Sequence, residues 1–221
     1  MSYQIRTFCA GKAHEEVVRK ILKHGIPLGT EDNDATLELP EPSCIHISTP
    51  LAKPMISPFS VYSEAYMEEY TRKFLHGYDA GQGFEYNYHD CLHAWGSRTL
   101  AKTPGAVLPI VDQVCSVIAL LKRSPTTRRA QVITWEPPVD LGSGEPPCLQ
   151  LIQFLLRQGR LNMKVVFRSN DMLMAAGCNM YALIRFQERV AANLGVEVGW
   201  YEHTSNSAHI YYKRDHPDLW S

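Results

Sequence analysis

The stretch that decides the fold is Glu145-Pro-Pro-Cys-Leu-Gln-Leu-Ile-Gln-Phe-Leu-Leu-Arg-Gln-Gly-Arg-Leu-Asn-Met-Lys-Val-Val-Phe-Arg-Ser169. Two apolar runs, 149–156 and 161–167, flank a Gln-Gly turn, a pattern that predicts a hairpin of two strands. Hairpin strands are antiparallel, so the start of the first strand and the end of the second lie at one edge of the sheet. Cys148 and the pair Arg168-Ser169 then meet there. The stretch predicts a nucleophile beside an anion site.

Cys148 by itself is ambiguous, because a buried free cysteine most often behaves as a small inert hydrophobe. Three neighbouring features favour a reactive thiol instead. Two prolines stiffen the loop in front of it, and it begins a strand, where a pocket can form at the sheet edge. The guanidinium of Arg168 on the next strand can stabilise a thiolate and hold an anion.

Composition limits the class of protein. The 221 residues are 45% hydrophobic, enough for a substantial core, and 22 basic residues against 23 acidic ones leave a net charge of -1. We therefore expect no nucleic-acid surface and no membrane surface, and any anion must be bound by a few placed cations. Six scattered cysteines without a CxxC pair argue against zinc and against a disulfide framework. Without a secretory or transmembrane run, a cytoplasmic protein is expected.

The periodicity of the remaining chain alternates between helix and strand. Helices are predicted over 13–24, 63–75, 107–123 and 180–194, and strands over 3–9, 130–135, 196–201 and 209–212, with one or two more within 38–47. The aromatic segment 84–95 is either a helix packed into the core or a wall of a ligand pocket. Its histidines fit no metal spacing, so no metal is expected. We find no repeat and no convincing linker, and expect one domain over residues 1–221.

Several short motifs occur in a telling order. Arg128-Arg129 precedes a strand that ends in Trp-Glu-Pro, Pro-Cys148 follows, and then come Arg-Ser-Asn-Asp171, Gly-Cys-Asn179 and His-Ile-Tyr211. Each motif is weak alone, but together they resemble the thymidylate synthase family. The resemblance covers most of the chain beyond residue 84, and the compact length is similar to the short archaeal branch of that family.

The resemblance implies an α+β fold with a large mixed β-sheet and flanking helices, and a homodimer in which two sheets pack back to back. It implies reductive methylation of dUMP to dTMP with 5,10-methylenetetrahydrofolate, or a related reduced pterin, as co-substrate. Cys148 would be the nucleophile that adds to C6 of the uracil. Arg168 and Ser169 would bind the dUMP phosphate, and Arg128 and Arg129 would be contributed by the partner subunit.

The resemblance assigns the other site residues in the same way. Asn179 would hydrogen-bond the uracil edge, and His209 and Tyr211 would hold the deoxyribose hydroxyl. Asp171 would bind the folate pterin, and Tyr88 would help to remove the C5 proton. For three of these residues an ordinary structural role stays open: a core tyrosine at 211, a satisfied strand histidine at 209 and a turn cap at 171.

The chain also departs from longer members of the family. They carry a histidine directly after the nucleophile, where this chain has Leu149. Their N-terminal phosphate-binding arginine loop and their C-terminal tail are not identifiable here. The helix glutamate that organises water for proton transfer in the family has no clean match here. It is expected near Glu68 or Glu69, and we assign the role to Glu69.

Two other functions remain open. A pyrimidine nucleotide hydroxymethylase of the same family, acting on dCMP, CMP or dUMP, would share the thiolate and the folate but let water capture the intermediate. A non-catalytic nucleotide- or RNA-binding protein would keep only the pocket. Cys148, Asn179 and Asp171 together argue against the second, since binding alone needs no nucleophile.

Overall fold

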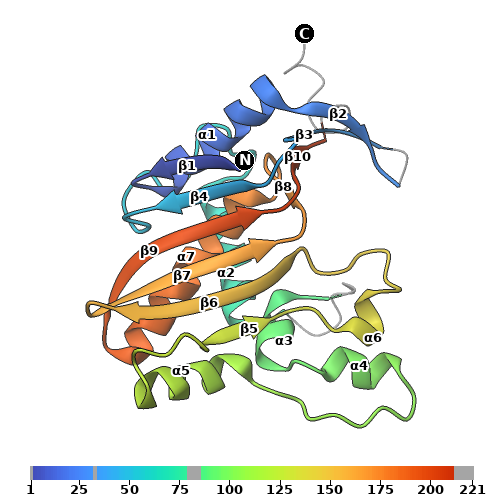
Figure 1. The fold of residues 1–221 in the computed structure, drawn as a ribbon, viewed down its shortest axis with the longest axis vertical. Helices are drawn as coiled ribbons and strands as arrows, with labels where there is room; N and C mark the ends of the chain where they lie inside the picture. Colours follow the sequence, from blue (N-terminus) through green and yellow to red (C-terminus); the bar gives the residue numbers. More distant parts are fainter. Residues whose placement is uncertain (1, 32–33, 79–85, 212–221) are drawn as a thin grey trace.

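The computed structural model describes residues 2–31, 34–78 and 86–211 (Figure 1). Helices and strands alternate along the chain in an α+β arrangement, as expected. In chain order the elements are β1 (Tyr3–Thr7), α1 (Ala10–His24), β2 (Ile26–Gly29), β3 (Ala35–Glu38), β4 (Ser43–Ile47), α2 (Glu64–His76), α3 (Tyr88–His93), α4 (Ser97–Lys102), α5 (Gln113–Arg123), β5 (Gln131–Ile133), α6 (Pro137–Asp140), β6 (Leu149–Arg157), β7 (Arg160–Phe167), β8 (Asn170–Asp171), α7 (Ala176–Leu194), β9 (Glu197–Ser205) and β10 (Ala208–Ile210).

The predicted hairpin lies inside the larger sheet, between β9 and the edge strand β5. Strands β6 and β7 pair antiparallel through the turn at Gln158 and Gly159, which both take positive φ angles, 53° and 73°. The six strands follow the order β1-β4-β9-β7-β6-β5, and the β1–β4 and β7–β9 pairs are parallel. The sheet is therefore large and mixed, as the resemblance implied.

A second, four-stranded sheet with the order β2-β3-β10-β8 lies beside the first. It begins where two parallel neighbours, β7 and β9, leave the large sheet together and continue as β8 and β10. Backbone hydrogen bonds cross this junction, from Asn206 N–H to Phe167 O at 3.0 Å and from Ser207 N–H to Arg168 O at 3.2 Å. Both segments are thereby held in register where the larger sheet ends, and this junction positions the site.

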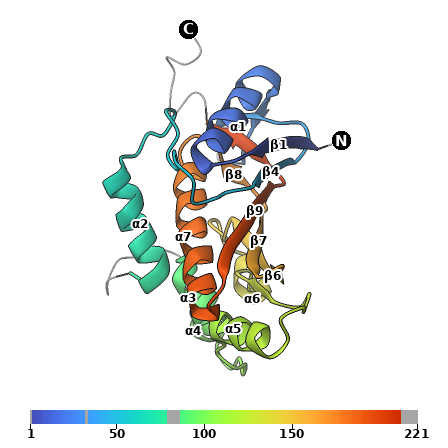
Figure 2. The same cartoon turned by 90° about the vertical axis from the view of Figure 1, so that its left-hand side faces the viewer.

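The helices cover one face of the large sheet (Figure 2). Helix α7 packs on strands β7 and β9, and α2 lies against the outer side of α7. Buried side chains of β7, β9 and α7 such as Phe167, Tyr201 and Phe186 form the core between them. The opposite face of β9 and β7 carries half-exposed polar pairs, including Lys164 with Glu202 at 2.9 Å, and no helix of the described ranges lies over it.

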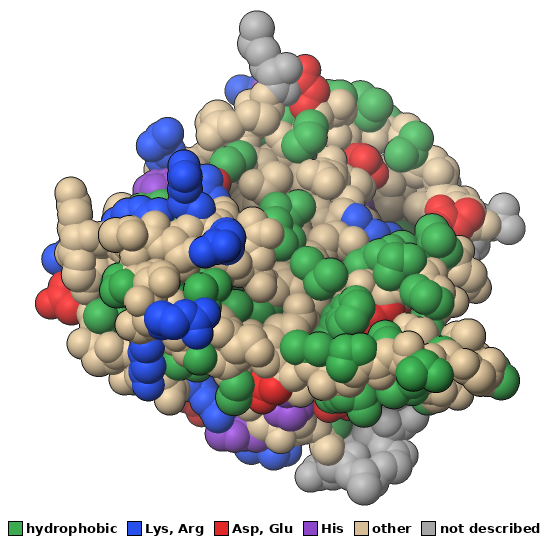
Figure 3. Space-filling view, turned by 60° about the horizontal axis from the view of Figure 1, so that its bottom comes forward, with side chains coloured by type: hydrophobic (Ala, Val, Ile, Leu, Met, Phe, Trp, Pro, Cys, Tyr) green, Lys and Arg blue, Asp and Glu red, His purple; other side chains and the backbone are tan. Residues whose placement is uncertain are grey.

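The helix predicted from residue 107 begins only at Gln113, so the prediction was wrong for its first residues. The Asp112 side chain accepts the N–H of Cys115 and caps the helix there. The segment before it stays outside the core, with Val107 98% exposed and Ile110 58% exposed. Figure 3 shows the molecule from below the view of Figure 1. On this face apolar side chains gather on one part and Lys and Arg side chains on another.

The aromatic segment 84–95 contains only a short helix, α3, and Phe84 lies outside the described residues. Strand β2 was missed, because residues 26–29 are exposed at the edge of the small sheet and show no alternation of burial. Helix α2 agrees with its prediction: the Ser63 side chain accepts the N–H of Tyr66, and the helix ends at Gly77 with φ of 89°.

Candidate active site

A cavity of about 650 Å³ opens at the junction of the two sheets. Its volume is in the range of small-molecule sites. The strand ends β6, β7, β8 and β10 and the start of α7 supply its walls, and β2, β3 and α2 close it from the N-terminal side. It brings together most of the predicted site residues: Tyr88, Cys148, Arg168, Ser169, Asp171, Asn179, His209 and Tyr211.

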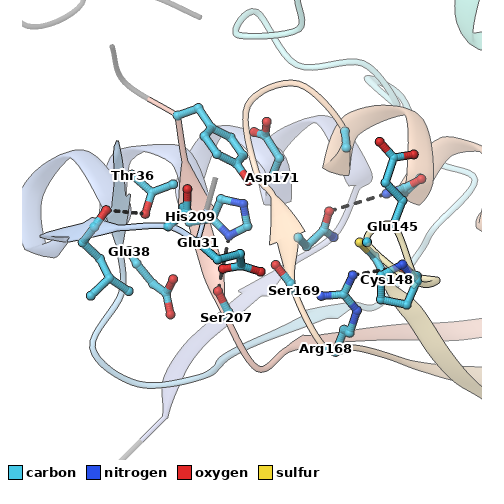
Figure 4. A pocket seen from close by; sticks show the side chains of 18 of the residues that line it. Glu31, Thr36, Glu38, Glu145, Cys148, Arg168, Ser169, Asp171, Ser207 and His209 are labelled. Carbon is cyan, nitrogen blue, oxygen red and sulfur yellow. Dashed lines mark hydrogen bonds between the residues drawn. The ribbon is translucent and has the colours of Figure 1, made fainter. Parts of the chain in front are cut away.

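Cys148 stands at the entrance of β6, and Arg168 lies directly beside its loop (Figure 4). The Arg168 guanidinium donates to the carbonyl oxygen of Pro147 at 3.1 Å and to that of Pro146 at 2.8 Å, and its backbone N–H donates to Cys148 O at 2.9 Å. Burial raises the pKa of the Cys148 thiol, while the charge of Arg168 lowers it. The resting thiol is therefore protonated at neutral pH, with one cation placed to favour the thiolate.

Two tyrosines form the wall next to the thiol. The Tyr88 hydroxyl accepts the N–H of Leu149 at 3.2 Å, and the rings of Tyr86 and Tyr88 meet edge to face at 5.5 Å. Burial raises the pKa of both phenols, that of Tyr86 to about 12. Both stay neutral and can donate a hydrogen bond at physiological pH. Tyr86 was no predicted site residue, although its aromatic segment indicated a pocket wall.

Asn179 lies in the first turn of α7, is 8% exposed and lines the cavity. The hydroxyl of Tyr70 donates to Asn179 Oδ1 at 2.9 Å. Tyr70 lies on α2 and lines the cavity, but sequence reasoning missed it. The available signal was its place beside Glu69, in the helix where an acidic residue was sought.

Glu69 does not reach the cavity. Its carboxylate binds the Arg72 guanidinium at 2.8 and 2.9 Å and lies 3.6 Å from Lys73 on the outer surface of α2, with 48% of the side chain exposed. The hydrogen bond from Arg72 lowers the pKa of Glu69 to about 2. Successive helix residues point about 100° apart, so Tyr70 faces the cavity and Glu69 faces solvent. The geometry corrects the choice of Glu69 for proton transfer.

Arg128 and Arg129 are exposed and do not line the cavity of their own chain. They precede β5, where Gln131 lies opposite Gln153 of β6. Arg129 is therefore level with the seventh residue beyond Cys148. At ~3.3 Å per residue, roughly 20 Å of strand separates the two.

The residues of β8 and β10 complete the cavity. Asp171 Oδ1 accepts the N–H groups of Leu173 and Met174, each at 3.0 Å, so the carboxylate does serve as a turn cap while it lines the cavity. His209 is 6% exposed, with Nδ1 3.3 Å from Ser207 Oγ. The Tyr211 ring stands at 89° to the His209 imidazole, 5.1 Å away.

The charges on the cavity wall are unbalanced (Figure 4). Among the described lining residues, Arg168 is the single Lys or Arg, whereas four are acidic: Glu31, Glu38, Glu145 and Asp171. One guanidinium carries a single positive charge, which is less than the charge of a dianionic phosphate. Within residues 2–31, 34–78 and 86–211 there is no group of His, Cys, Asp and Glu side chains suited to a metal ion. Nor does that part of the chain contain a helix that could cross a membrane.

A thiol, an arginine and an amide thus meet in one cavity at the end of a mixed sheet, an arrangement suited to an enzyme site. The family model described as "Thymidylate synthase" matches residues 65–218, more than half of the chain. The chain therefore belongs to the thymidylate synthase family, and it is a methyltransferase of that family.

Relatives from archaea agree with this assignment, each named "Putative thymidylate synthase". One from Methanocaldococcus jannaschii is 37% identical over 208 residues, which cover 92% of this chain and 88% of the relative. One from Methanothermobacter thermautotrophicus is 31% identical and covers 96% of this chain and 94% of the relative. One from Methanosarcina acetivorans is 38% identical over 69% of this chain and 64% of the relative. The resemblance to the archaeal branch is confirmed.

Proposed function

We propose that the chain converts dUMP to dTMP with 5,10-methylenetetrahydrofolate, through a covalent bond between the Cys148 sulfur and C6 of the uracil. The observation that carries this proposal is the shared cavity of Cys148, Arg168 and Asn179 in a chain of this family. Uracil C5 is a poor nucleophile, and addition of a thiolate at C6 turns C5 into an enolate-like carbon. The folate supplies the one-carbon unit and the hydride.

The cavity residues would divide the work as follows. Cys148 loses its proton, and the positive charge of Arg168 favours the thiolate. Tyr88, with its hydroxyl beside the loop of the nucleophile, assists removal of the C5 proton. Binding of phosphate falls to Arg168 and Ser169. A related reduced pterin in place of the plain folate would use the same steps.

The remaining contacts would fix the orientation of the substrates. Asn179 reads the uracil edge, since an amide donates and accepts at once. His209 and Tyr211, stacked edge to face, hold the deoxyribose hydroxyl. Asp171 binds the pterin with the carboxylate that also caps the turn after β8.

We further propose a homodimer whose two large sheets pack back to back, so that Arg128 and Arg129 reach the phosphate site of the partner subunit. Two observations support it. The sheet face opposite the helices is not covered by a described helix (Figure 2), and Arg168 is the lone cation among the described residues of the cavity wall. All six cysteines are free thiols, which suits a reducing compartment, and we propose the cytoplasm.

The test is release of tritium from C5-labelled dUMP in the presence of methylenetetrahydrofolate, with the product compared with dTMP and hydroxymethyl-dUMP. We expect tritium release coupled to dTMP. Hydroxymethyl-dUMP as the product would make the chain a hydroxymethylase, and no release from dUMP in a folded protein would refute the proposal.

A second experiment tests the nucleophile itself. With 5-fluoro-dUMP and the folate, the intermediate cannot lose its C5 substituent and accumulates. Intact-mass spectrometry should show one adduct per site in the native protein and none in Cys148→Ser. An adduct that persists in the variant, or maps to Cys178, would exclude Cys148.

A further inference from the structure

Ser207 lines the same cavity as Arg168 and Ser169, but it was no predicted site residue and has no part in the proposed reaction. Its backbone is bound on both sides to the segment that carries Ser169. The Ser207 N–H donates to Arg168 O at 3.2 Å, and the Asn170 N–H donates to Ser207 O at 2.9 Å. These two hydrogen bonds bracket Ser169, as expected for paired residues on parallel strands.

The register of the strands gives the same pairing of the two serines. Ser205 lies opposite Phe167 before the junction of the sheets, and β10 and β8 keep the same offset after it. Ser207 therefore lies opposite Ser169. Paired residues of adjacent strands share a face and lie about 5 Å apart, so the two hydroxyl groups can reach oxygens of one anion. Figure 4 shows Ser169 beside Arg168, with Ser207 on the neighbouring segment.

The Ser207 hydroxyl also contacts His209, with Oγ 3.3 Å from Nδ1. In a neutral imidazole this hydrogen bond can run in either direction. If the hydroxyl donates, its proton is used within the protein. If Nδ1 donates instead, the hydroxyl proton is available to a ligand in the cavity. A dianionic phosphate can only accept hydrogen bonds, so its binding selects the second arrangement, in which His209 supports Ser207 as a donor.

Neutral donors suit this cavity wall, where Arg168 is the single Lys or Arg of the described lining residues. A hydrogen bond to an ionised acceptor is about twice as strong as one between neutral groups. We propose that Ser207 is a further ligand of the substrate phosphate, that it binds this group together with Ser169, and that His209 Nδ1 donates to its oxygen. The inference rests on the proposed function, and it adds a phosphate ligand from the chain that carries Cys148.

The test compares dUMP with deoxyuridine, which lacks the phosphate, by NMR titration of the protein without folate. We expect Ser207→Ala to weaken dUMP about tenfold, because a hydrogen bond to a charged group is lost, and to change deoxyuridine less than about threefold. Ser207→Thr retains a hydroxyl and should keep most of the native affinity. Asn206→Ala is the matched control: Asn206 is exposed and does not line the cavity, so both affinities should stay native. Ser169→Ala should reproduce the pattern of Ser207→Ala.

Unchanged dUMP binding in a folded Ser207→Ala would overturn the inference. Equal weakening of dUMP and deoxyuridine would also overturn it, because that result indicates a structural role or an effect through His209. If Ser207→Ala does not fold, Ser207→Cys decides the question, since a thiol of similar size is a weak donor and should weaken dUMP selectively. A native protein that binds dUMP no better than deoxyuridine would refute the proposed function as well.

Discussion

The two arginine sites of this chain share a proposed ligand, the phosphate, but differ in their location, exposure and hydrogen-bond partners. Arg168 lies inside the cavity, and its guanidinium is held by the carbonyl oxygens of Pro146 and Pro147. Arg128 and Arg129 are exposed in the loop before β5, well away from Cys148 along the sheet. The first site belongs to the cavity of its own chain, whereas the second lines no part of that cavity.

This contrast separates what one chain builds from what two chains share. The thiol, the amide proposed to read the base and the arginine proposed to bind the phosphate come from adjacent strand ends and from the first turn of α7, so a monomer can position them. The exposed arginine pair is useful to the site only if a second subunit presents it. The predictions below test the contrast, beginning with the largest expected effect.

The sharpest test of the contrast is subunit complementation. Arg129→Ala and Cys148→Ala should each be nearly inactive, the latter by at least about a thousandfold, since it lacks the nucleophile. Unfolded, mixed and refolded together, they should regain up to about a quarter of native activity, because a mixed dimer has one intact site. Dimer composition is measured by native mass spectrometry.

The matched control is Arg168→Ala mixed with Cys148→Ala. Both residues belong to the cavity wall of a single chain, so every mixed site carries a defect and activity should not return. Recovery in this control, or none in demonstrably mixed Arg129→Ala dimers, would reverse the contrast between the two arginine sites.

Asn179→Asp tests the base-reading part of the single-chain wall. A carboxylic acid can donate to N3 of cytosine and accept from its amino group. A mismatched buried partner costs roughly 1–3 kcal/mol, so dUMP turnover should fall about ten- to a hundredfold, with gain of C5 proton exchange on dCMP. Exchange is followed by NMR in deuterated water. Unchanged base preference would remove Asn179 as the reader.

A smaller effect should appear in the reactivity of the Cys148 thiol. Its pKa is raised by burial, so the thiolate fraction and the alkylation rate should increase with pH and keep increasing beyond pH ~8.5, where an ordinary thiol levels off. Arg168→Ala removes the charge that lowers this pKa and should slow alkylation several-fold at neutral pH. Peptide mapping after iodoacetamide treatment gives the rate.

Cys115 provides an internal reference for this experiment, because it is exposed and pairs with Asp112 rather than Arg168. Its alkylation rate should be the same in the native protein and in Arg168→Ala. Arg168→Lys should retain part of the native rate at Cys148. Equal Cys148 rates in all three proteins would show that Arg168 does not act on the thiol.

The smallest effect is expected from Glu69→Gln. The carboxylate is half exposed and paired with Arg72, so its loss should change kcat less than twofold. Its pKa of about 2 lies below the unfolded value, so any stability from this pair is present above pH ~4.3 and is lost as the pH falls toward 2. A large loss of kcat at neutral pH would return Glu69 to the reaction.

The sequence predicted best where local pattern and local structure agree. Strands β6 and β7, the turn between them and the placement of Cys148 beside Arg168 follow from alternation and hairpin geometry, and the structure confirms them. The cap at Ser63 is equally local. The helix expected over 107–123 was confirmed from Gln113 onward, and its first residues were wrong because apolar periodicity continues into a segment that never enters the core.

Contacts between distant parts of the chain were beyond the sequence. Tyr70 and Asn179 are 109 residues apart, and which side of α2 faces the cavity depends on how that helix packs on α7. The residue of α2 that lines the cavity is Tyr70, one position after the predicted Glu69. The hydrogen bond between Asn170 Nδ2 and His203 Nε2, 2.9 Å long, could not be predicted for the same reason, since no sequence motif joins the two residues.

The hydrogen bonds from Arg168 to the carbonyl oxygens of Pro146 and Pro147 connect the proposed phosphate site to the loop before Cys148. On the proposed function, a phosphate bound to Arg168 acts on the loop that carries the sulfur. Energy from a non-reacting group is then available at the reacting centre. Deoxyuridine without its phosphate should therefore lose turnover as well as affinity, and free phosphite should restore part of the turnover. The phosphate would act as an activator that travels with the substrate.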